Sequence, residues 1–157
     1  MTIRDMGLTK AIHEKGTYQV LDRDGLTDRA EIMKIYMQAL SADYFLSSAN
    51  AISEDGVIVN IDGNGNRVAA LTYGPKHIIF VVGLNKVCQD VESALKRARS
   101  TASPINASRF NGNTPCQVDG VCHNCNSTDC ICNYIHFLRN SPGGRHQVVL
   151  VGEDLGY

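Results

Sequence analysis

The sequence predicts a single α/β domain over residues 1–157, built on a mostly parallel sheet. Segments with helical periodicity alternate with short strand-like segments, as in folds whose parallel strands are joined by helices. Residues 77–82 form an almost uninterrupted apolar run, as expected for a central strand covered on both faces. With 157 residues, 43% hydrophobic and 20% charged, the chain is long enough and apolar enough for a substantial core.

The first half of the chain predicts helices and strands in alternation. Residues 2–15 read as an amphipathic helix with Thr2 as its N-cap, and Gly16 ends it. Residues 27–41 read as a second helix, capped by Thr27, because four apolar side chains recur there at helical spacing. The remaining elements expected in this half are strands at 17–21, 44–48 and 57–61 and a short helix at 67–73.

The second half predicts one long helix and two further strands. Apolar residues at helical spacing indicate a helix from residue 87 onward, which Ser103-Pro104 interrupts or restarts. Residues 134–138 and 147–151 read as strands, and the Ser-Pro-Gly-Gly segment between them predicts a C-terminal hairpin.

Charge and hydropathy exclude two classes of partner. The net charge is −1 and basic residues form no extended run, so nothing indicates nucleic acid. No apolar run approaches the roughly 18 residues of a membrane span, and the N-terminus lacks the apolar region of a secretory signal. A cytoplasmic location is therefore expected. In that compartment, clustered cysteines indicate metal binding or redox activity before disulfides.

The most distinctive segment is the cysteine-rich loop, residues 114–133. It holds five of the six cysteines, spaced C-x5-C-x2-C-x4-C-x-C from Cys116 to Cys132, among polar residues that cannot build a core. Thiolates in such a segment can converge on one inorganic centre. An iron–sulfur cluster fits the spacing better than zinc, because zinc ribbons usually carry two C-x2-C pairs. Disulfides or free thiols are the third alternative, and Cys88 reads as a small core residue.

A second constellation could bind an anion. Gly63-x-Gly65 lies between a strand and a short helix, where exposed N–H groups and Arg67 could hold a phosphate or carboxylate. The dinucleotide fingerprint fails, because its third glycine would be at position 68, which is Val. The alternative is a β-turn that needs no ligand.

Asn85 and Lys86 follow the expected central strand at its carboxyl end, where ligands bind in open α/β sheets. Lys86 could pair with a substrate anion or could be a solvated residue of the first helical turn. The candidate ligand-binding residues are Glu54, Asp55, Asn60, Asp62, Gly63, Gly65, Asn66, Arg67, Asn85 and Lys86.

Several motifs together resemble a known family. They are the segment from Ser48 to Ala70, Gly83-Leu-Asn-Lys, the Thr-Pro-Cys loop and the closing Val151-Gly-Glu-Asp-Leu-Gly. This combination resembles the LUD-domain (lactate utilisation protein) family, in particular its stand-alone, cysteine-bearing members. The resemblance implies a three-layer Rossmann-like fold of the ribose-phosphate isomerase, glucosamine-phosphate deaminase and CoA-transferase kind. It also implies that an N-terminal strand and helix are missing.

The resemblance also implies a ligand set and a role. The family pattern places the metal ligands at Cys116, Cys122, Cys125 and Cys132, which leaves Cys130 supernumerary and His123 as a spare nitrogen donor. A [4Fe-4S] cluster is then the favoured cofactor and zinc the alternative. The implied role is a redox component, or subunit, in the oxidation of a small 2-hydroxy acid, with a redox partner on a second chain.

Two other roles stay open. A metal-stapled module could bind or sense a small carboxylate or phosphorylated metabolite without catalysis of its own. An isomerase or transferase could use Glu54 or Asp55 as a base, by analogy of fold alone.

Overall fold

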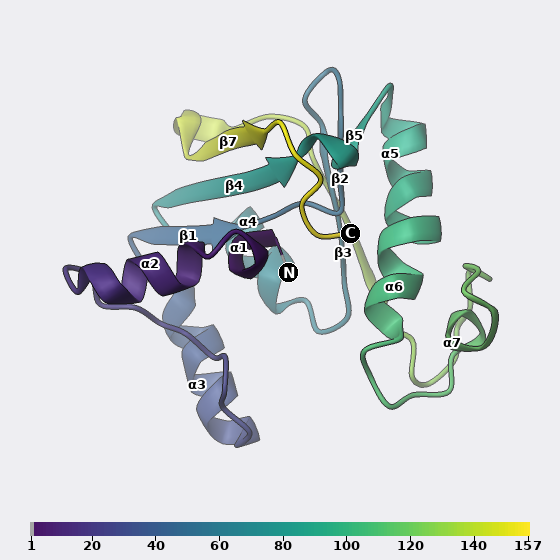
Figure 1. The fold of residues 1–157 in the computed structure, drawn as a ribbon, viewed down its shortest axis with the longest axis horizontal. Helices are drawn as coiled ribbons and strands as arrows, with labels where there is room; N and C mark the ends of the chain where they lie inside the picture. Colours follow the sequence, from purple (N-terminus) through teal and green to yellow (C-terminus); the bar gives the residue numbers. More distant parts are fainter. Residues whose placement is uncertain (1) are drawn as a thin grey trace.

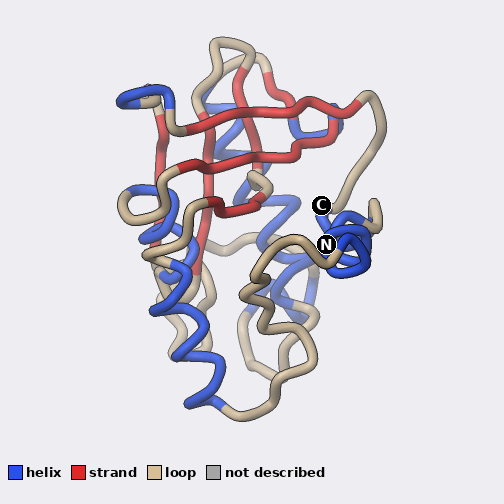
Figure 2. Tube along the Cα trace, turned by 90° about the vertical axis from the view of Figure 1, so that its left-hand side faces the viewer, coloured by secondary structure: helices blue, strands red, loops and turns tan. Residues whose placement is uncertain are grey.

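Two packed sheets form the centre of the computed structural model, which describes residues 2–157. The first sheet has three parallel strands in the order β1 (Tyr44–Ser47), β4 (His77–Gly83) and β7 (His146–Val151). Its strands run across those of the second sheet, as Figures 1 and 2 show. The chain is thus α/β, as predicted, but its strands are divided between two sheets.

The second sheet is mixed and has four strands in the order β5 (Val87–Cys88), β2 (Ala51–Ser53), β3 (Ile58–Asp62) and β6 (Tyr134–Leu138). β2 and β5 are parallel, whereas β3 is antiparallel to both β2 and β6. Three of the five strand pairings in the two sheets are parallel. The expectation of mostly parallel pairing is therefore confirmed.

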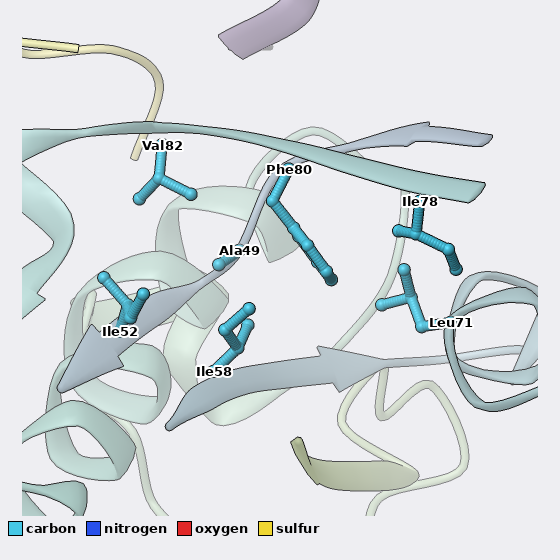
Figure 3. Close-up of a cluster of buried hydrophobic side chains, with 7 residues drawn as sticks. All are labelled: Ala49, Ile52, Ile58, Leu71, Ile78, Phe80 and Val82. Carbon is cyan, nitrogen blue, oxygen red and sulfur yellow. The ribbon is translucent and has the colours of Figure 1, made fainter. Parts of the chain in front are cut away.

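The main core lies between the two sheets. Ile78, Phe80 and Val82 alternate along β4 and point towards Ile52 and Ile58 of the second sheet (Figure 3). Alternate residues of β3 point the other way, so Val59 and Ile61 pack against Ala94 and Ala98 on the far side. The result is a layered order of sheet, sheet and helix.

The helices differ from the sequence expectation mainly at their ends. The first is divided at Gly7, which has φ 74°, into α1 (Thr2–Asp5) and α2 (Leu8–Lys15). Asp28, not Thr27, caps the next helix by accepting hydrogen bonds from two backbone N–H groups. The helices from here to residue 102 are α3 (Arg29–Ala39), α4 (Asn66–Thr72), the 3-10 turn η1 (Leu84–Lys86), α5 (Val91–Arg97) and the π-helical turn η2 (Ala98–Ala102).

The long helix expected in the second half begins later than predicted. The long helix begins at Val91, because Val87 and Cys88 pair with β2 and Asp90 caps α5 together with Ser93. The remaining helices are α6 (Ser103–Ala107), α7 (Pro115–Asp119) and the 3-10 turn η3 (Pro142–Gly144).

The predicted C-terminal hairpin is wrong. β6 pairs with β3 over five residues and β7 pairs with β4 over six, so the two strands belong to different sheets. Arg145 fixes the crossing by donating to four backbone carbonyls at the end of α4 and beyond it. The Pro-Gly-Gly segment does form a turn, but pairing with strands distant in the sequence determines which sheet each strand joins.

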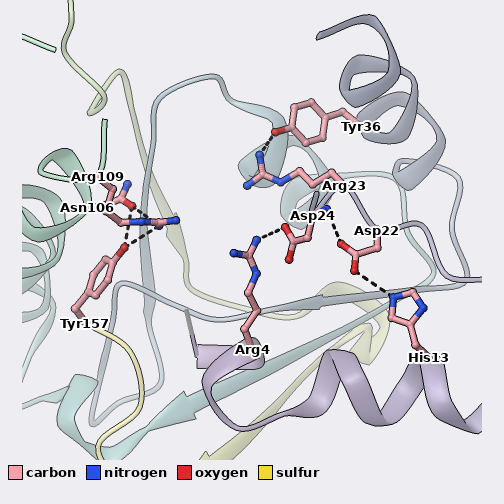
Figure 4. A network of polar contacts seen from close by, with 9 residues as sticks. All are labelled: Arg4, His13, Asp22, Arg23, Asp24, Tyr36, Asn106, Arg109 and Tyr157. Atoms are coloured by element: carbon pink, nitrogen blue, oxygen red, sulfur yellow. Dashed lines mark hydrogen bonds and ion pairs between the residues drawn. The ribbon is translucent and has the colours of Figure 1, made fainter. Parts of the chain in front are cut away.

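The predicted strand at residues 17–21 is absent, and these residues take no regular structure. Side-chain contacts hold the surrounding loop instead. His13 contacts Asp22, Arg4 pairs with Asp24 and Arg23 contacts Tyr36 (Figure 4). A strand needs a neighbour for its N–H and C=O groups, and the loop has none in the sheet.

Candidate functional site

The cysteine-rich loop begins on a helix that the sequence did not indicate. Thr114 and Gln117 form a capping box around α7, and Gly120 ends the helix with φ 76°. The Gln117 amide donates to the carbonyls of Ala107 and Phe110 at 2.9 and 2.7 Å, which ties α7 to the end of α6. Cys116 is therefore held by helical backbone, while the other four thiols stand on irregular chain. Figure 1 places this segment beside α6, at the margin of the fold.

Hydrogen bonds within the loop fix its irregular part. The Asn113 N–H donates to Asp129 at 2.9 Å and so joins the two limbs of the loop. Asn133 donates to the carbonyl of Gly63 at 3.0 Å, which attaches the end of the loop to the turn after β3. The segment thus has a defined shape although it lacks a hydrophobic core of its own.

All five thiols of the loop line one pocket of about 100 Å³. Its floor comes from the layered core, through Ile61 of β3 and through Ser103 and Pro104 of α6. The polar residues on its wall are Arg99, Thr114, His123, Asn124 and Asn126. The sequence predicted that the cysteines would gather, and this geometry brings all of them, Cys130 included, to one cavity.

The thiols are half-buried and form no disulfide. Among residues 2–157, no three cysteine, histidine or acidic side chains converge closely enough to hold a metal ion. The chemistry of the donor set nevertheless fits a thiophilic metal, because five thiols lie on the wall of one pocket. The sulfur atoms stand around the cavity, and a metal would have to draw them together.

The thiols of the loop do not share one environment. The backbone N–H of Ser127 is the main cause that lowers the pKa of Cys125. Burial raises the pKa of Cys132, and the nearby thiolates of Cys116, Cys122 and Cys130 add to that rise. Placing several thiolates in one cavity is therefore unfavourable without a cation, and metal binding must displace their protons.

His123 lies on the wall of the same pocket. Its Nε2 lies 2.7 Å from Oδ2 of Asp119, four residues earlier at the end of α7. The other ring nitrogen remains as a potential donor. Carboxylates hold metal-binding histidines in this way, so the pair could orient the ring towards a metal.

At the turn after β3, where the sequence predicted an anion site, a carboxylate of the same chain already accepts from the backbone N–H groups. Oδ2 of Asp62 accepts hydrogen bonds from the backbone N–H groups of Arg67 and Val68, at 3.0 and 3.1 Å. These groups are therefore not free to hold an external anion. Gly65 supplies the left-handed turn before α4 with φ 79°, and Asn66 begins that helix. The contacts at Gly63–Asn66 correspond to the turn alternative.

Arg67 is an internal clamp and not an exposed counter-charge. Its guanidinium donates to the carbonyls of Ser48 and Ile61 and to the side-chain oxygens of Asn50 and Asn60. Burial lowers its pKa, and Asp62 opposes that effect. All four acceptors belong to the irregular link between the sheets or to β3, so the guanidinium joins these two segments.

Asn60 is fully buried on β3 and pairs in register with His136 of β6. The Asn60 amide nitrogen and His136 Nδ1 are both buried, and neither has a hydrogen-bond partner within residues 2–157. Burial lowers the pKa of His136, so its ring is neutral near pH 7. The sequence did not single out this histidine.

Glu54 and Asp55 lie apart from the other candidates. Both are exposed on the turn between β2 and β3, where Asp55 contacts the hydroxyl of Ser53. This turn and the Asp62 turn are at opposite ends of β3, about 13 Å apart at the usual rise per residue. The structure therefore does not bring these carboxylates together with Arg67.

Lys86 is 2% exposed, which excludes the alternative of a solvated lysine. Its ammonium donates to Thr2 Oγ1 at 2.9 Å, Ser48 Oγ at 3.2 Å and the Ala49 carbonyl at 3.3 Å. Asn85 is half-buried beside it and donates to the Gly156 carbonyl. Sequence reasoning missed Thr2 and Ser48 at this position, because their segments meet only through the tertiary fold.

Within residues 2–157, no helix is long and apolar enough to cross a bilayer.

Comparison with known proteins yields a family and one solved structure. The model of the LUD domain matches residues 1–151. A crystal structure of a DUF162-family protein from Deinococcus radiodurans is similar with 18% sequence identity and a TM-score of 0.41. That match covers 74% of this chain and 58% of the other, so the chain spans less than two thirds of the solved protein. No protein with a curated description matches the sequence.

The family match extends over both sheets, the cysteine-rich loop and the link that carries Ser48. The resemblance drawn from the sequence motifs is therefore confirmed. This chain belongs to the LUD-domain family, which is associated with lactate utilisation.

Proposed function

We propose that this protein binds an iron–sulfur centre in the cysteine-rich loop and serves as a redox component in the oxidation of a small 2-hydroxy acid such as lactate. The observation that carries the proposal is the pocket whose wall holds all five thiols of the loop. Family membership supports the substrate class. A cytoplasmic location, where thiols stay reduced, belongs to the same proposal.

Four of the five thiols would hold the cluster, and the family pattern selects Cys116, Cys122, Cys125 and Cys132. A cluster with four thiolate ligands supplies one-electron transfer. Oxidation of a 2-hydroxy acid to a 2-oxo acid releases two electrons and two protons. A flavin or another redox group on a partner subunit is therefore part of the proposal, because a single cluster does not accept a hydride.

This chain's own residues prepare the pocket for such a centre. α7 fixes Cys116, and the β3–α6 floor keeps water from one side of the cavity. Arg99 on the wall provides a positive charge beside the thiolates. Binding would draw the sulfur atoms inward and order the loop further, so the bound centre should also stabilise the fold.

Metal analysis of protein purified without exposure to air tests the proposal. Stoichiometric iron and sulfide with a visible charge-transfer spectrum are expected. Cys122→Ser and Cys125→Ser should abolish the spectrum. Cys88→Ser is the matched control, since Cys88 lies outside the loop and should leave the metal content unchanged. Stoichiometric zinc without iron would refute the redox function.

A zinc-stapled binding module is the second candidate, and the His123–Asp119 contact favours it. In this case His123 would replace one thiolate, and the metal would hold the loop in shape without electron transfer. His123→Ala separates the two candidates, because it should lower zinc affinity through loss of a ligand but leave an all-cysteine cluster intact. Cys130→Ser tests the ligand choice in the same way, and its loss of metal would contradict the family's set.

A further inference from the structure

The carboxyl ends of β1, β4 and β7 meet at one edge of the parallel sheet. Ser48 follows β1, Asn85 and Lys86 follow β4, and the segment Leu155–Gly156 follows β7. Contacts join them, since Asn85 accepts from the Leu155 N–H and donates to the Gly156 carbonyl, both at 3.3 Å. Open α/β sheets bind their ligands at such an edge.

Three cationic side chains surround the link between the two sheets at this edge. Three successive carbonyls accept from them in turn: Ser48 from Arg67 at 3.1 Å, Ala49 from Lys86 at 3.3 Å and Asn50 from Arg97 at 2.6 Å. Within residues 2–157, no carboxylate forms an ion pair with any of the three. The link therefore carries an excess of positive charge.

The two arginines have a structural explanation that Lys86 lacks. Arg67 has four acceptors on two segments, and Arg97 also donates to the Asn85 carbonyl at 2.9 Å, so each guanidinium joins irregular backbone. Two of the three acceptors of Lys86 are instead the hydroxyls of Thr2 and Ser48. A buried ammonium without a negative partner is costly, and a neutral donor could bond these hydroxyls.

The group around Lys86 is suited to an anion. The Ser48 hydroxyl accepts from the lysine and keeps a donor that can turn towards a ligand oxygen, whereas the Thr2 hydroxyl donates to the Leu155 carbonyl at 3.3 Å and so holds the last segment beside the lysine. Ser48 and Asn85 are half-buried, so the group is not sealed from solvent. Gly156 permits the close approach of the last segment, because a Cβ there would stand 3.2 Å from Lys86 Nζ and 2.5 Å from Thr2 Oγ1.

We propose that Lys86, with the hydroxyl of Ser48, binds the oxyanion of a small metabolite, a carboxylate or a phosphate, at the carboxyl end of the parallel sheet. The ligand compensates the lysine charge and takes a hydrogen bond from the Ser48 hydroxyl. This site differs from the turn at Asp62, which has its own carboxylate, and it shares no residue with the cysteine pocket. Anion binding at this site does not depend on whether the loop binds iron, zinc or no metal.

Thermal unfolding of the full chain in lactate or inorganic phosphate tests the site, with sodium chloride keeping the ionic strength constant. A saturable rise in Tm is expected with one of the two anions, which distinguishes carboxylate from phosphate recognition. Lys86→Met should weaken the apparent Kd by about tenfold or more, since a charge-assisted contact is lost. The matched control is Lys76→Met, an exposed lysine paired with Asp43, which should keep the wild-type response.

Two further measurements make the result decisive. Ser48→Ala should also weaken the response, and it carries the test if the Lys86 variant does not fold. Cys122→Ser, which should lose the metal, should respond to the anion as the wild type does. Equal affinity in the wild type and both site variants, or no saturable response to either anion, would overturn the proposal.

Discussion

The pH dependence of stability measures the charge buried at Lys86. Burial is the main reason why its pKa falls from 10.5 to about 8, and the charges of Arg97 and Arg67 lower it further. The side chain is 2% exposed, so solvent screens it little. Because a tenfold change in proton affinity corresponds to about 1.4 kcal/mol, keeping this lysine charged in the folded state costs about 3 kcal/mol.

The sign of the effect follows from the two pKa values. Between the folded value of about 8 and the ordinary value of 10.5, the unfolded chain binds more protons at this position than the folded chain. The contribution of Lys86 to the free energy of unfolding should therefore increase with pH across this window. Below the folded pKa the full cost remains, because the lysine is charged in both states.

Urea unfolding across this pH range under reducing conditions can isolate the contribution. Lys86→Met removes the titrating group, so the wild type should gain up to about 3 kcal/mol relative to the variant as the pH rises. The other lysines, the tyrosines and the thiols titrate in both proteins and cancel in the difference. Lys76→Met should follow the wild-type profile. Parallel profiles for the wild type and Lys86→Met would refute the argument.

Three substitutions test the packing, capping and crossing contacts by urea unfolding. Phe80→Ala should lower the free energy of unfolding by about 3–5 kcal/mol, because Phe80 is fully buried between the sheets; a loss below 1 kcal/mol would show that the core collapses around the gap. Asp90→Ala should cost about 1 kcal/mol, with Asp90→Asn largely restoring the α5 cap; equal losses in both would exclude a cap effect. Arg145→Met should lower the free energy of unfolding by about 1–3 kcal/mol, because it leaves carbonyls at the end of α4 unpaired, and Arg145→Lys should not fully restore it. An unchanged free energy of unfolding would mean that water satisfies those carbonyls.

Local sequence signals predicted the elements that carry a strong apolar pattern or a glycine-rich turn. The apolar run at residues 77–82 became β4, and the turn of Asp62–Gly65 begins α4 as expected. The spacing of the cysteines likewise indicated that their thiols would gather, and they line one pocket. In each case the cause lies within a few residues of its effect, so the pattern could be read without the fold.

Other features depended on partners distant in the chain. Residues 17–21 have strand-like side chains but find no neighbouring strand, and residues 134–138 and 147–151 join different sheets despite the turn between them. Arg67 reads from sequence as a counter-charge, yet the carbonyls that accept its hydrogen bonds make it a clamp. Burial and pairing belong to the assembled fold, which sequence periodicity does not specify.

By itself, the sequence determined that this chain is an α/β domain with a sulfur-rich loop and the motifs of the LUD family. Only the tertiary structure decided that Lys86 is buried beside Thr2 and Ser48, that Asp62 fills its own turn and that all five thiols share one cavity. The physical reason is distance along the chain. Burial, together with the charges of Arg97 and Arg67, lowers the pKa of Lys86, and these causes arise only when segments distant in the sequence pack together.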